Sequence, residues 1–306
     1  MKENKVVINI LLIIIMFLVI VACAVTYMCF TNDVEIIEPQ QEQAIFTPEN
    51  YPRIDGSIET LPLAKQFKAN FTKTDINEVE VKHSKTYNAY VNLINKNVDL
   101  ILVTQPTEEV KRLAKDKEIE LEIVPIAKDA LVFFVNKNNP VENLTLNQIQ
   151  NIYSGKIKNW SQVGGIDSKI FAFQKPETST SQAGMLELVM KGTKMLQPIT
   201  ETIPQNTADI IDVIADYDNS PSSLGYSYRY YANTMYTNAQ MKLLSVNGIE
   251  PTYENIQTGL YDLQTVYYAV IRKDEPENSN TRKLLNVMIS ANGQNIVKEA
   301  GYVENY

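Results

Sequence analysis

The hydrophobic and polar positions divide the chain into two regions. Residues 6–30 form a nearly continuous apolar run, and the rest of the chain is mostly polar with short apolar clusters. At about 1.5 Å per residue, this run is long enough to cross a bilayer as one helix. Lys2 and Lys5 precede it, and positively charged flanks stay in the cytosol. We therefore expect residues 1–31 to anchor the chain in the cell membrane, with its body on the extracytoplasmic side.

The same run allows two forms of attachment. Residues 20–23 read Ile-Val-Ala-Cys, the form of a bacterial lipidation site, so Cys23 is a lipidation candidate. The residues after Cys23 stay apolar, which favours an uncleaved signal anchor instead. Cys23 and Cys29 could also be ordinary small residues of a membrane helix. Both cysteines lie in this run, so the body has no thiol for a disulfide, a nucleophile or a metal site.

The pattern changes after the anchor. Residues 32–50 are acidic and polar, contain two prolines and show no helical period, so we predict a linker. Residues 61–71 then have apolar positions at helical spacing, whereas residues 99–104 form a continuous apolar strand of the kind buried on both faces. This alternation predicts an α/β fold with mainly parallel sheets, and the length predicts two lobes. Further strands are expected at residues 79–81, 123–126, 130–135, 170–173, 224–228 and 266–271, and further helices at residues 87–94, from 106 onward, 146–153, 182–190, 281–289 and 294–300.

Charge and composition exclude several classes of function. The formal net charge is -8 and the sequence pI is about 4.9, so a nucleic-acid-binding protein is not expected. His83 is the only histidine, which excludes a multi-histidine metal site, and nothing suggests a Ser-His-acid triad. No glycine-rich nucleotide loop or metal-ligand cluster is visible. We therefore expect no enzyme activity, no cofactor and no metal.

Two polar turns precede predicted helices. Residues 55–60 lead into the helix at 61–71, and the hydroxyl-rich residues 178–181 lead into the helix at 182–190. A helix N-terminus exposes unpaired N–H groups with partial positive charge, and nearby hydroxyls add donors. Each turn alone could be a simple N-cap. Together, one in each lobe, they suggest a cleft that binds an oxyanion or a carboxylate from both sides.

A series of short motifs follows in order from residue 51. This series resembles the phosphate-type substrate-binding proteins of ABC transporters, within the type II periplasmic-binding-protein superfamily, and extends to the C-terminus. The motifs are YPRIDGS (51–57), TLPLA (60–64), KTYNAY (85–90), VDLILVTQP (98–106), ALVFFVNKNNP (130–140), LTL (144–146), IYSGKIKNW (152–160), VGG (163–165), FQKPETSTSQ (173–182) and LGYSY (224–228).

The resemblance implies two α/β lobes joined by a two-strand hinge. Lobe 1 would comprise residues 51–127 plus 264–306, and lobe 2 would comprise residues 128–263. The hinge crossings would lie near residues 126–129 and 260–267. Carried over by motif, the ligand-binding residues would be Ser57, Thr60, Thr86, Gln105, Lys175, Ser179, Thr180 and Ser181.

Three of these positions depart from the family's phosphate site. Lys175 stands where an arginine is usual, and lysine cannot form a bidentate fork. Thr180 stands where a glycine is usual. Gln105 replaces a carboxylate that would accept the proton of hydrogen phosphate and repel sulfate. We therefore expect oxyanion binding that is weaker and less selective than in true phosphate binders.

These observations lead to one expected function and one alternative. The chain is expected to be an extracytoplasmic, monomeric binding protein that captures a small phosphate-like oxyanion for an ABC permease in the membrane. The alternative is a ligand-free or sensory domain at the cell surface, with a protein or cell-wall partner.

Overall fold

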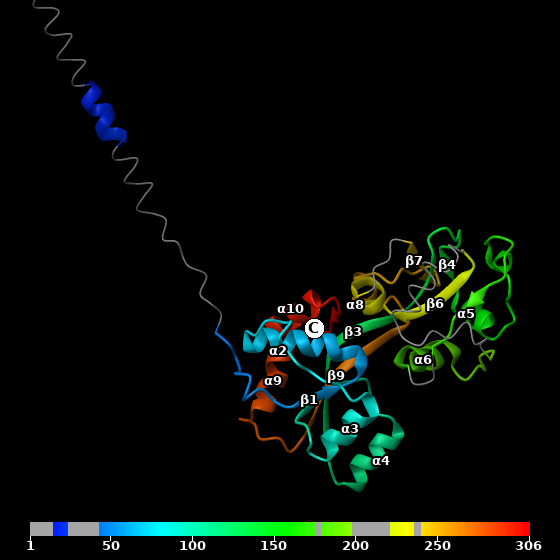
Figure 1. Ribbon diagram of the computed structural model, residues 1–306, viewed down its shortest axis with the longest axis horizontal. Helices are drawn as coiled ribbons and strands as arrows, with labels where there is room; N and C mark the ends of the chain where they lie inside the picture. Colours follow the sequence, from blue (N-terminus) through cyan, green and yellow to red (C-terminus); the bar gives the residue numbers. More distant parts are fainter. Residues whose placement is uncertain (1–14, 24–42, 176–178, 198–220, 236–239) are drawn as a thin grey trace, which may run out of the picture. The chain divides into compact units, whose positions relative to one another are not determined.

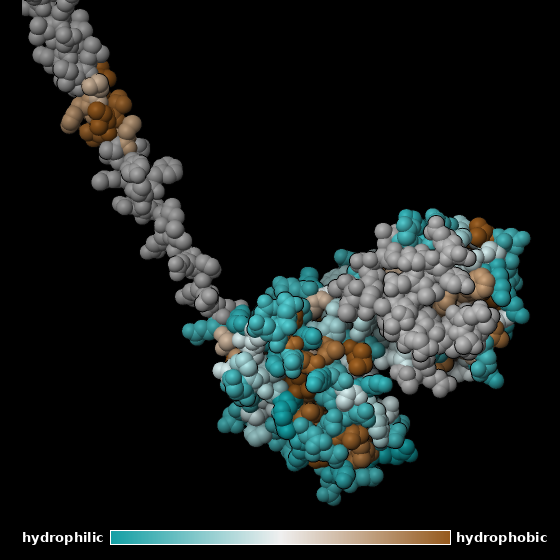
Figure 2. Space-filling view, in the orientation of Figure 1, coloured by the Kyte–Doolittle hydropathy of each residue, from teal (hydrophilic) through white to brown (hydrophobic). Residues whose placement is uncertain are grey.

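The computed structural model describes residues 15–23, 43–175, 179–197, 221–235 and 240–306. The chain divides into two compact units, Met1–Gln43 and Ala44–Tyr306 (Figure 1). In the first unit, residues 15–23 are helical, and Figure 2 shows their surface as strongly hydrophobic. Within the described ranges, no helix has the length and hydrophobicity needed to cross a bilayer. The remainder of the expected anchor, residues 1–14 and 24–31, lies outside these ranges.

One sheet of the body is covered by helices on both faces. Its strands run in the order β1 (Ile54–Gly56), β2 (Leu100–Val103), β9 (Gln264–Arg272) and β3 (Leu121–Asn136), and β10 (Val303–Glu304) also pairs with β3. Leu100 and Leu102 pack into the cluster formed with α2 (Leu61–Thr72), α9 (Asn280–Ile289) and α10 (Ala291–Glu299). Ile101 and Val103 pack on the opposite face with α3 (Thr86–Ile94) and α4 (Glu108–Asp116). This confirms the prediction that residues 99–104 contain a strand buried on both faces.

The second half of β3 belongs to another group of strands. There it pairs with β6 (Ser223–Tyr228) and β7 (Met241–Leu243), and β5 (Phe171–Ala172) pairs with β6. A separate two-stranded sheet joins β4 (Asn143–Leu144) to β8 (Ser245–Val246). The surrounding helices are α5 (Leu146–Tyr153), η2 (Trp160–Val163), α6 (Thr180–Gly184), the π-helix η3 (Met185–Met190), η6 (Tyr231–Met235) and α8 (Tyr253–Gln257).

Strand β3 corrects two predictions made from the sequence. Residues 123–126 and 130–135 were expected to be separate strands, yet both lie within the single strand Leu121–Asn136. Its pairing with β9 shifts register between Pro125 and Ala127, so the proline is accommodated by an irregularity that does not end the strand. Strands β3 and β9 pair antiparallel with each other, β2 pairs antiparallel with β9, and β6 pairs antiparallel with β3. The prediction of mainly parallel sheets is therefore also wrong.

The predicted strand at residues 79–81 is also wrong. This segment has no regular structure, although Val79 is buried and the carbonyl of Glu80 accepts a hydrogen bond from Lys68 at 3.2 Å. The apolar positions that suggested a strand therefore reflect burial of a loop against the body.

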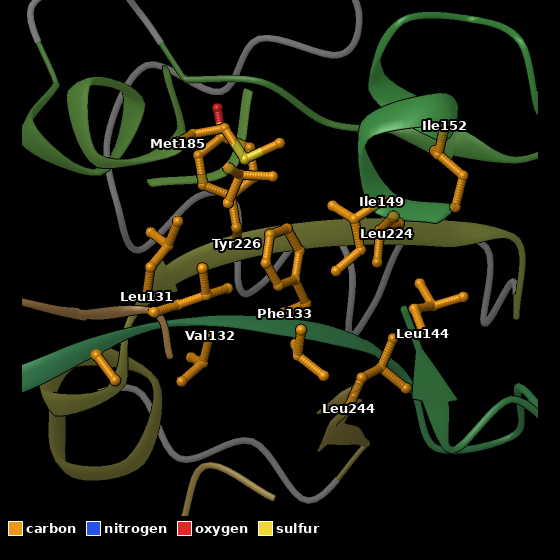
Figure 3. Packing of buried hydrophobic residues seen from close by; sticks show 14 of the residues in the cluster. Leu131, Val132, Phe133, Leu144, Ile149, Ile152, Met185, Leu224, Tyr226 and Leu244 are labelled. Atoms are coloured by element: carbon orange, nitrogen blue, oxygen red, sulfur yellow. The ribbon is translucent and has the colours of Figure 1, made fainter. Parts of the chain in front are cut away.

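The core around the second half of β3 is rich in aromatic side chains (Figure 3). Phe133, Tyr153 and Tyr226 contact one another, with ring centroids 5.5 to 6.4 Å apart. Trp160 is fully buried, and its indole N–H donates to the carbonyl of Ser222 at 2.9 Å. Trp160 therefore has a packing role in this core.

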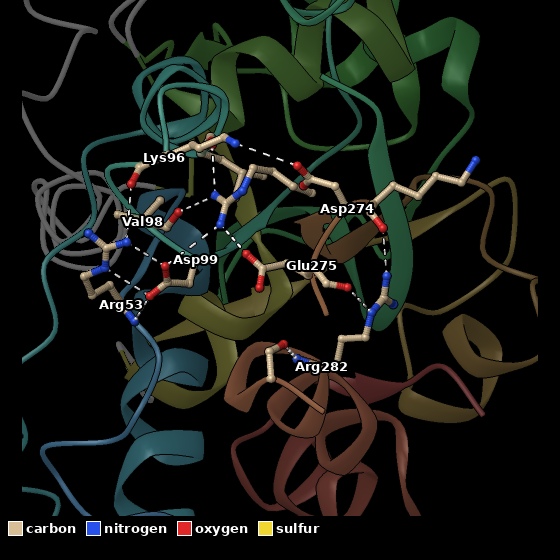
Figure 4. Close-up of polar contacts among 11 residues, drawn as sticks. Arg53, Lys96, Val98, Asp99, Asp274, Glu275 and Arg282 are labelled. Carbon is tan, nitrogen blue, oxygen red and sulfur yellow. Dashed lines mark hydrogen bonds and ion pairs between the residues drawn. The ribbon is translucent and has the colours of Figure 1, made fainter. Parts of the chain in front are cut away.

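Ion pairs and hydrogen bonds to backbone carbonyls stabilise the end of the first sheet where β1 and β2 begin and β9 ends (Figure 4). Arg53 binds Asp99 through two nitrogens, at 2.6 and 3.0 Å. The buried side chain of Arg272 donates to the carbonyl of Val98 at 2.7 Å and pairs with Glu275. These contacts fix β1 and β9 to the loop before β2, and β1 leads directly into the first polar turn.

Candidate functional site

The first polar turn begins at Gly56, the last residue of β1. A Cβ atom at this position would lie 2.4 Å from the carbonyl oxygen of Leu102 and 2.7 Å from a ring carbon of His83, so only glycine fits. Ser57 and Thr60 follow and are fully buried. The Thr60 hydroxyl lies 2.7 Å from the carbonyl of Leu102 and 3.0 Å from that of Ser57, and its single proton is shared between these two acceptors, with Leu102 the nearer. Thr60 therefore holds the turn against β2.

Asp55 fixes the base of this turn. Its carboxylate accepts hydrogen bonds from the backbone N–H groups of Gly56 and Ser84, both at 2.7 Å. The hydroxyl of Ser84 and the amide of Asn92 donate to it at 2.6 and 2.8 Å. Burial alone would raise the pKa of Asp55, but these hydrogen bonds outweigh it and lower the pKa. Asp55 was expected in this turn, but its sequence neighbours give no sign of this role.

His83 contacts the backbone of the same turn. Its Nδ1 atom is 2.6 Å from the carbonyl oxygen of Ser57, so Nδ1 carries the proton and donates. Burial lowers the pKa of this imidazole, which favours the neutral ring. His83 is half-buried, and nothing in the sequence indicated its contact with the turn.

The second polar turn surrounds the start of α6. Ser179 precedes the helix without a side-chain capping bond, and its hydroxyl lies 3.0 Å from that of Ser181. Lys175 is buried, and its backbone N–H lies 3.2 Å from both Gln182 Oε1 and Tyr226 Oη. Thr178, which the sequence included in this turn, lies outside the described residues.

The two turns meet at Glu59, a residue of η1 (Ile58–Thr60). Its carboxylate accepts hydrogen bonds from the hydroxyls of Thr180 in the second turn and Ser57 in the first. Glu59 is 8% exposed, and its Oε2 atom is buried with no hydrogen-bond partner among the described residues. Burial raises the pKa of Glu59, against these two hydrogen bonds. A carboxylate therefore lies between hydroxyls from both turns.

A second buried carboxylate lies close enough to interact with Glu59. Asp129, in β3, accepts hydrogen bonds at Oδ1 from the N–H groups of Ala130 and Tyr230, at 2.8 and 3.2 Å. Its Oδ2 atom is buried without a partner among the described residues. Burial raises the pKa of Asp129 to about 7, and the nearby charge of Glu59 adds to the effect.

Tyrosines complete the surroundings of this pair. Tyr302 donates from its hydroxyl to the carbonyl of Glu59 at 2.7 Å, and the hydroxyl of Tyr267 is buried with no partner in the part of the chain that the structure describes. The two carboxylates raise the pKa values of Tyr228, Tyr267 and Tyr302, although burial is the larger cause.

The predicted binding residues are thus only partly brought together. Ser57 and Thr180 converge on Glu59, with Ser179 and Ser181 beside Thr180. Thr86 begins α3 and is half-buried, whereas Gln105 follows β2 and is exposed. Two cavities, of about 270 and 600 Å³, have no residue of either turn in their lining. Within the described ranges there is no cluster of three histidine, cysteine, aspartate or glutamate side chains that could hold a metal ion.

Comparison with known proteins identifies the family. Residues 47–292 match the PBP superfamily domain. The chain belongs to this family. Among curated relatives, the phosphate-binding protein PstS of Borreliella burgdorferi is 25% identical over 83% of this chain and 90% of that protein. The PstS of Staphylococcus saprophyticus is 26% identical over 81% of this chain and 78% of its own length.

Solved structures agree with this PBP assignment. An ABC-type phosphate transport receptor from Vibrio cholerae superimposes with a TM-score of 0.65 and 22% identity, covering 82% of this chain and 98% of the receptor. At this identity the likeness shows the fold alone. It confirms the α/β PBP fold that the sequence motifs predicted.

Proposed function

We propose that this PBP domain captures a small phosphate-like oxyanion between its two polar turns and delivers it to an ABC permease. The observation that carries the proposal is the carboxylate of Glu59, which accepts hydrogen bonds from Ser57 and Thr180. These two hydroxyls come from turns far apart in the sequence and are directed at one oxyanionic group. The curated relatives named phosphate-binding protein PstS support the choice of ligand.

The proposal includes the division into lobes and the position of the chain in the cell. Lobe 1 comprises residues 51–127 plus 264–306, and lobe 2 comprises residues 128–263, with β3 and β9 as the connection. The apolar residues 6–30 anchor the chain to the membrane through a signal-anchor helix or through a lipid on Cys23, with the body outside the cytosol as a monomer. Binding is reversible and involves no chemistry on the ligand.

Titration calorimetry with inorganic phosphate tests this function. Ser57→Ala and Thr180→Val each remove a hydroxyl donor to a charged ligand, at an expected cost of about 1.5–3 kcal/mol, or about 10- to 100-fold in Kd. Thr193→Val is the matched control, because Thr193 is exposed and lies after η3. Unchanged affinity in both turn variants would refute the assignment of the site.

The position of Glu59 also supports a second candidate function. A buried carboxylate that already accepts hydrogen bonds from both turns could hold them together without any ligand. The chain would then be a ligand-free or sensory surface domain with a protein or cell-wall partner. A thermal-shift series distinguishes the two functions, since an oxyanion that binds only the native state raises the melting temperature. No shift with phosphate, sulfate or other oxyanions would favour the second function.

A further inference from the structure

The cavity of about 270 Å³ lies apart from both polar turns, where the end of α5 and the loop after it meet β5. Its inner wall includes Ile152, Tyr153 and Ile170, which are at most 7% exposed. One side is closed by Leu196, whose N–H donates to the carbonyl of Tyr153 and whose carbonyl accepts from the amide of Gln174, both at 2.8 Å. The cavity is therefore a built part of the fold with an apolar interior.

The charged side chains that line this cavity are all positive. Lys158 and Lys169 are exposed members of the lining, which contains no aspartate or glutamate. Within the described ranges neither lysine forms an ion pair, and the ammonium group of Lys169 lies 5.2 Å from the ring centroid of Phe171, another lining residue. Because the chain as a whole has a net charge of -8, this is a local positive region, and it attracts an anion.

Strand β5 adds an open backbone edge to the cavity. The N–H groups of Phe171 and Phe173 donate to backbone carbonyls on the β6 side, at 3.0 and 2.9 Å. Because successive residues of a strand direct their N–H groups to opposite edges, Ala172 directs its N–H and C=O groups away from β6. Ala172 lines the cavity, and these groups have no hydrogen-bond partner among the described residues. The cavity thus offers a backbone donor in addition to the two ammonium groups.

We propose that this cavity is a second binding site, for the ionised form of a small carboxylic acid with an apolar body. The apolar body occupies the interior, where its burial provides the main stabilisation, and the carboxylate lies toward Lys158, Lys169 and the N–H of Ala172. A cavity of about 150 Å³ holds benzene, so this one has room for roughly ten non-hydrogen atoms. The site is separate from the oxyanion site proposed above, because no residue of either turn lines it.

Methyl NMR of the full-length protein, labelled at isoleucine and leucine, tests the site with 3-phenylpropionate and with octanoate. At least one acid should bind saturably with a Kd of about 1 mM or below, and its apolar protons should give intermolecular NOEs to Ile152, Ile157 and Leu196. The matching alcohols, 3-phenylpropanol and octanol, keep the apolar body and lack the charge. The alcohol should bind about 3- to 10-fold more weakly than its acid, because exposed ammonium groups attract a carboxylate only modestly. Inorganic phosphate should not displace the acid.

Two variants separate the charge from the apolar interior. The double variant Lys158→Gln and Lys169→Gln should lose the preference for the acid and bind the alcohol as before. Lys156→Gln with Lys194→Gln is the matched control, because these two lysines are exposed, lie outside the lining and change the net charge equally. Ile157→Trp places a larger side chain in the cavity and should weaken acid and alcohol alike, by about tenfold or more.

The possible results divide cleanly. No saturable binding of either acid up to about 10 mM would overturn the site. Equal affinity for acid and alcohol would overturn its selectivity for an anion and leave an apolar side chain of another protein as the occupant. Displacement of the acid by phosphate would place the acid at the oxyanion site instead. The lysine variants change only exposed side chains, so they test the proposal even if Ile157→Trp does not fold. None of these measurements requires oxyanion capture, so either site can fail while the other stands.

Discussion

Asp55 should be among the most sensitive positions for the stability of the first sheet and the helices around it. Its carboxylate is 4% exposed and accepts four hydrogen bonds, from Gly56, Ser84 twice, and Asn92. Hydrogen bonds to a charged group contribute about 1.5–3 kcal/mol each, but the cost of burying the carboxylate offsets part of the sum. We expect Asp55→Asn to lower the free energy of unfolding by about 3–4 kcal/mol.

Asparagine preserves the shape of the side chain and so isolates its chemistry. One carboxylate oxygen becomes an NH₂ group, which can only donate. At the position of Oδ1 it would face two backbone N–H groups, and at the position of Oδ2 it would face the amide of Asn92, so at least one donor is left unsatisfied in either orientation. Asp55→Asn should therefore be nearly as destabilising as Asp55→Ala. Asp116→Asn is the control, because Asp116 is exposed at the end of α4.

Urea denaturation followed by two signals is the appropriate assay. Trp160 is the only tryptophan and lies in the core around the second half of β3, so its fluorescence reports that region. Circular dichroism reports both regions. Asp55→Asn should shift the circular dichroism transition to lower urea, with a smaller shift in fluorescence. A loss below about 0.5 kcal/mol in both signals would refute the role assigned to Asp55.

The pH dependence gives Asp55 a further signature. Its pKa is lowered in the folded state, so its stabilisation is present above the unfolded pKa, near 3.9. This stabilisation is lost as the pH falls through the folded pKa. The difference in stability between the wild type and Asp55→Asn should therefore shrink in acid. A difference that stays constant down to pH 2 would contradict this explanation.

Two further predictions concern the buried carboxylate of Asp129 and the membrane anchor. Because burial raises the pKa of Asp129 to about 7, the folded state binds more protons than the unfolded state between about pH 4 and 7, and stability should fall as the pH rises through this range. In Asp129→Asn, the decrease in the free energy of unfolding between pH 4.5 and 8, measured by urea denaturation, should be smaller by about 2–4 kcal/mol. An equally large decrease in the variant would contradict this role of Asp129. Metabolic labelling with a fatty acid should give a label that Cys23→Ala abolishes if the anchor is a lipid, whereas an unlabelled wild-type protein in the membrane fraction would identify a signal anchor.

Local signals predicted several elements well. The helix at residues 146–153 was predicted with its observed bounds, because Thr145 and Gln148 form a capping box that depends only on nearby residues. The alternation of Leu100, Ile101, Leu102 and Val103 between two helical layers follows from a strand that is apolar on both sides. In such segments, residues that are close in the sequence are enough to predict the secondary structure.

Features that depend on distant partners were not predictable in this way. Residues 123–126 and 130–135 were expected to be separate strands, but residues 127–130 also pair with β9, so β3 continues through them. Glu59 lies in a turn that the sequence predicted to be part of an anion site. An acidic residue alone argues against such a site, and its contact with Thr180 is visible only in the structure. Likewise, the role of Asp55 becomes visible only when Ser84 and Asn92 are placed around it.

The position of β9 in the first sheet has a consequence for how the protein is made. This strand lies between β2 and β3, although its residues come near the end of the chain. During synthesis, β3, β6 and β7 are all available before β9 emerges, so the second core can form early. The first sheet must wait for β9, α9 and α10, and until then β2 exposes unpaired backbone and apolar side chains. A chain that stops before residue 264 would therefore lose the centre of its first sheet, and a chaperone that protects the unfinished chain would act mainly on the earliest part of the body to be synthesised.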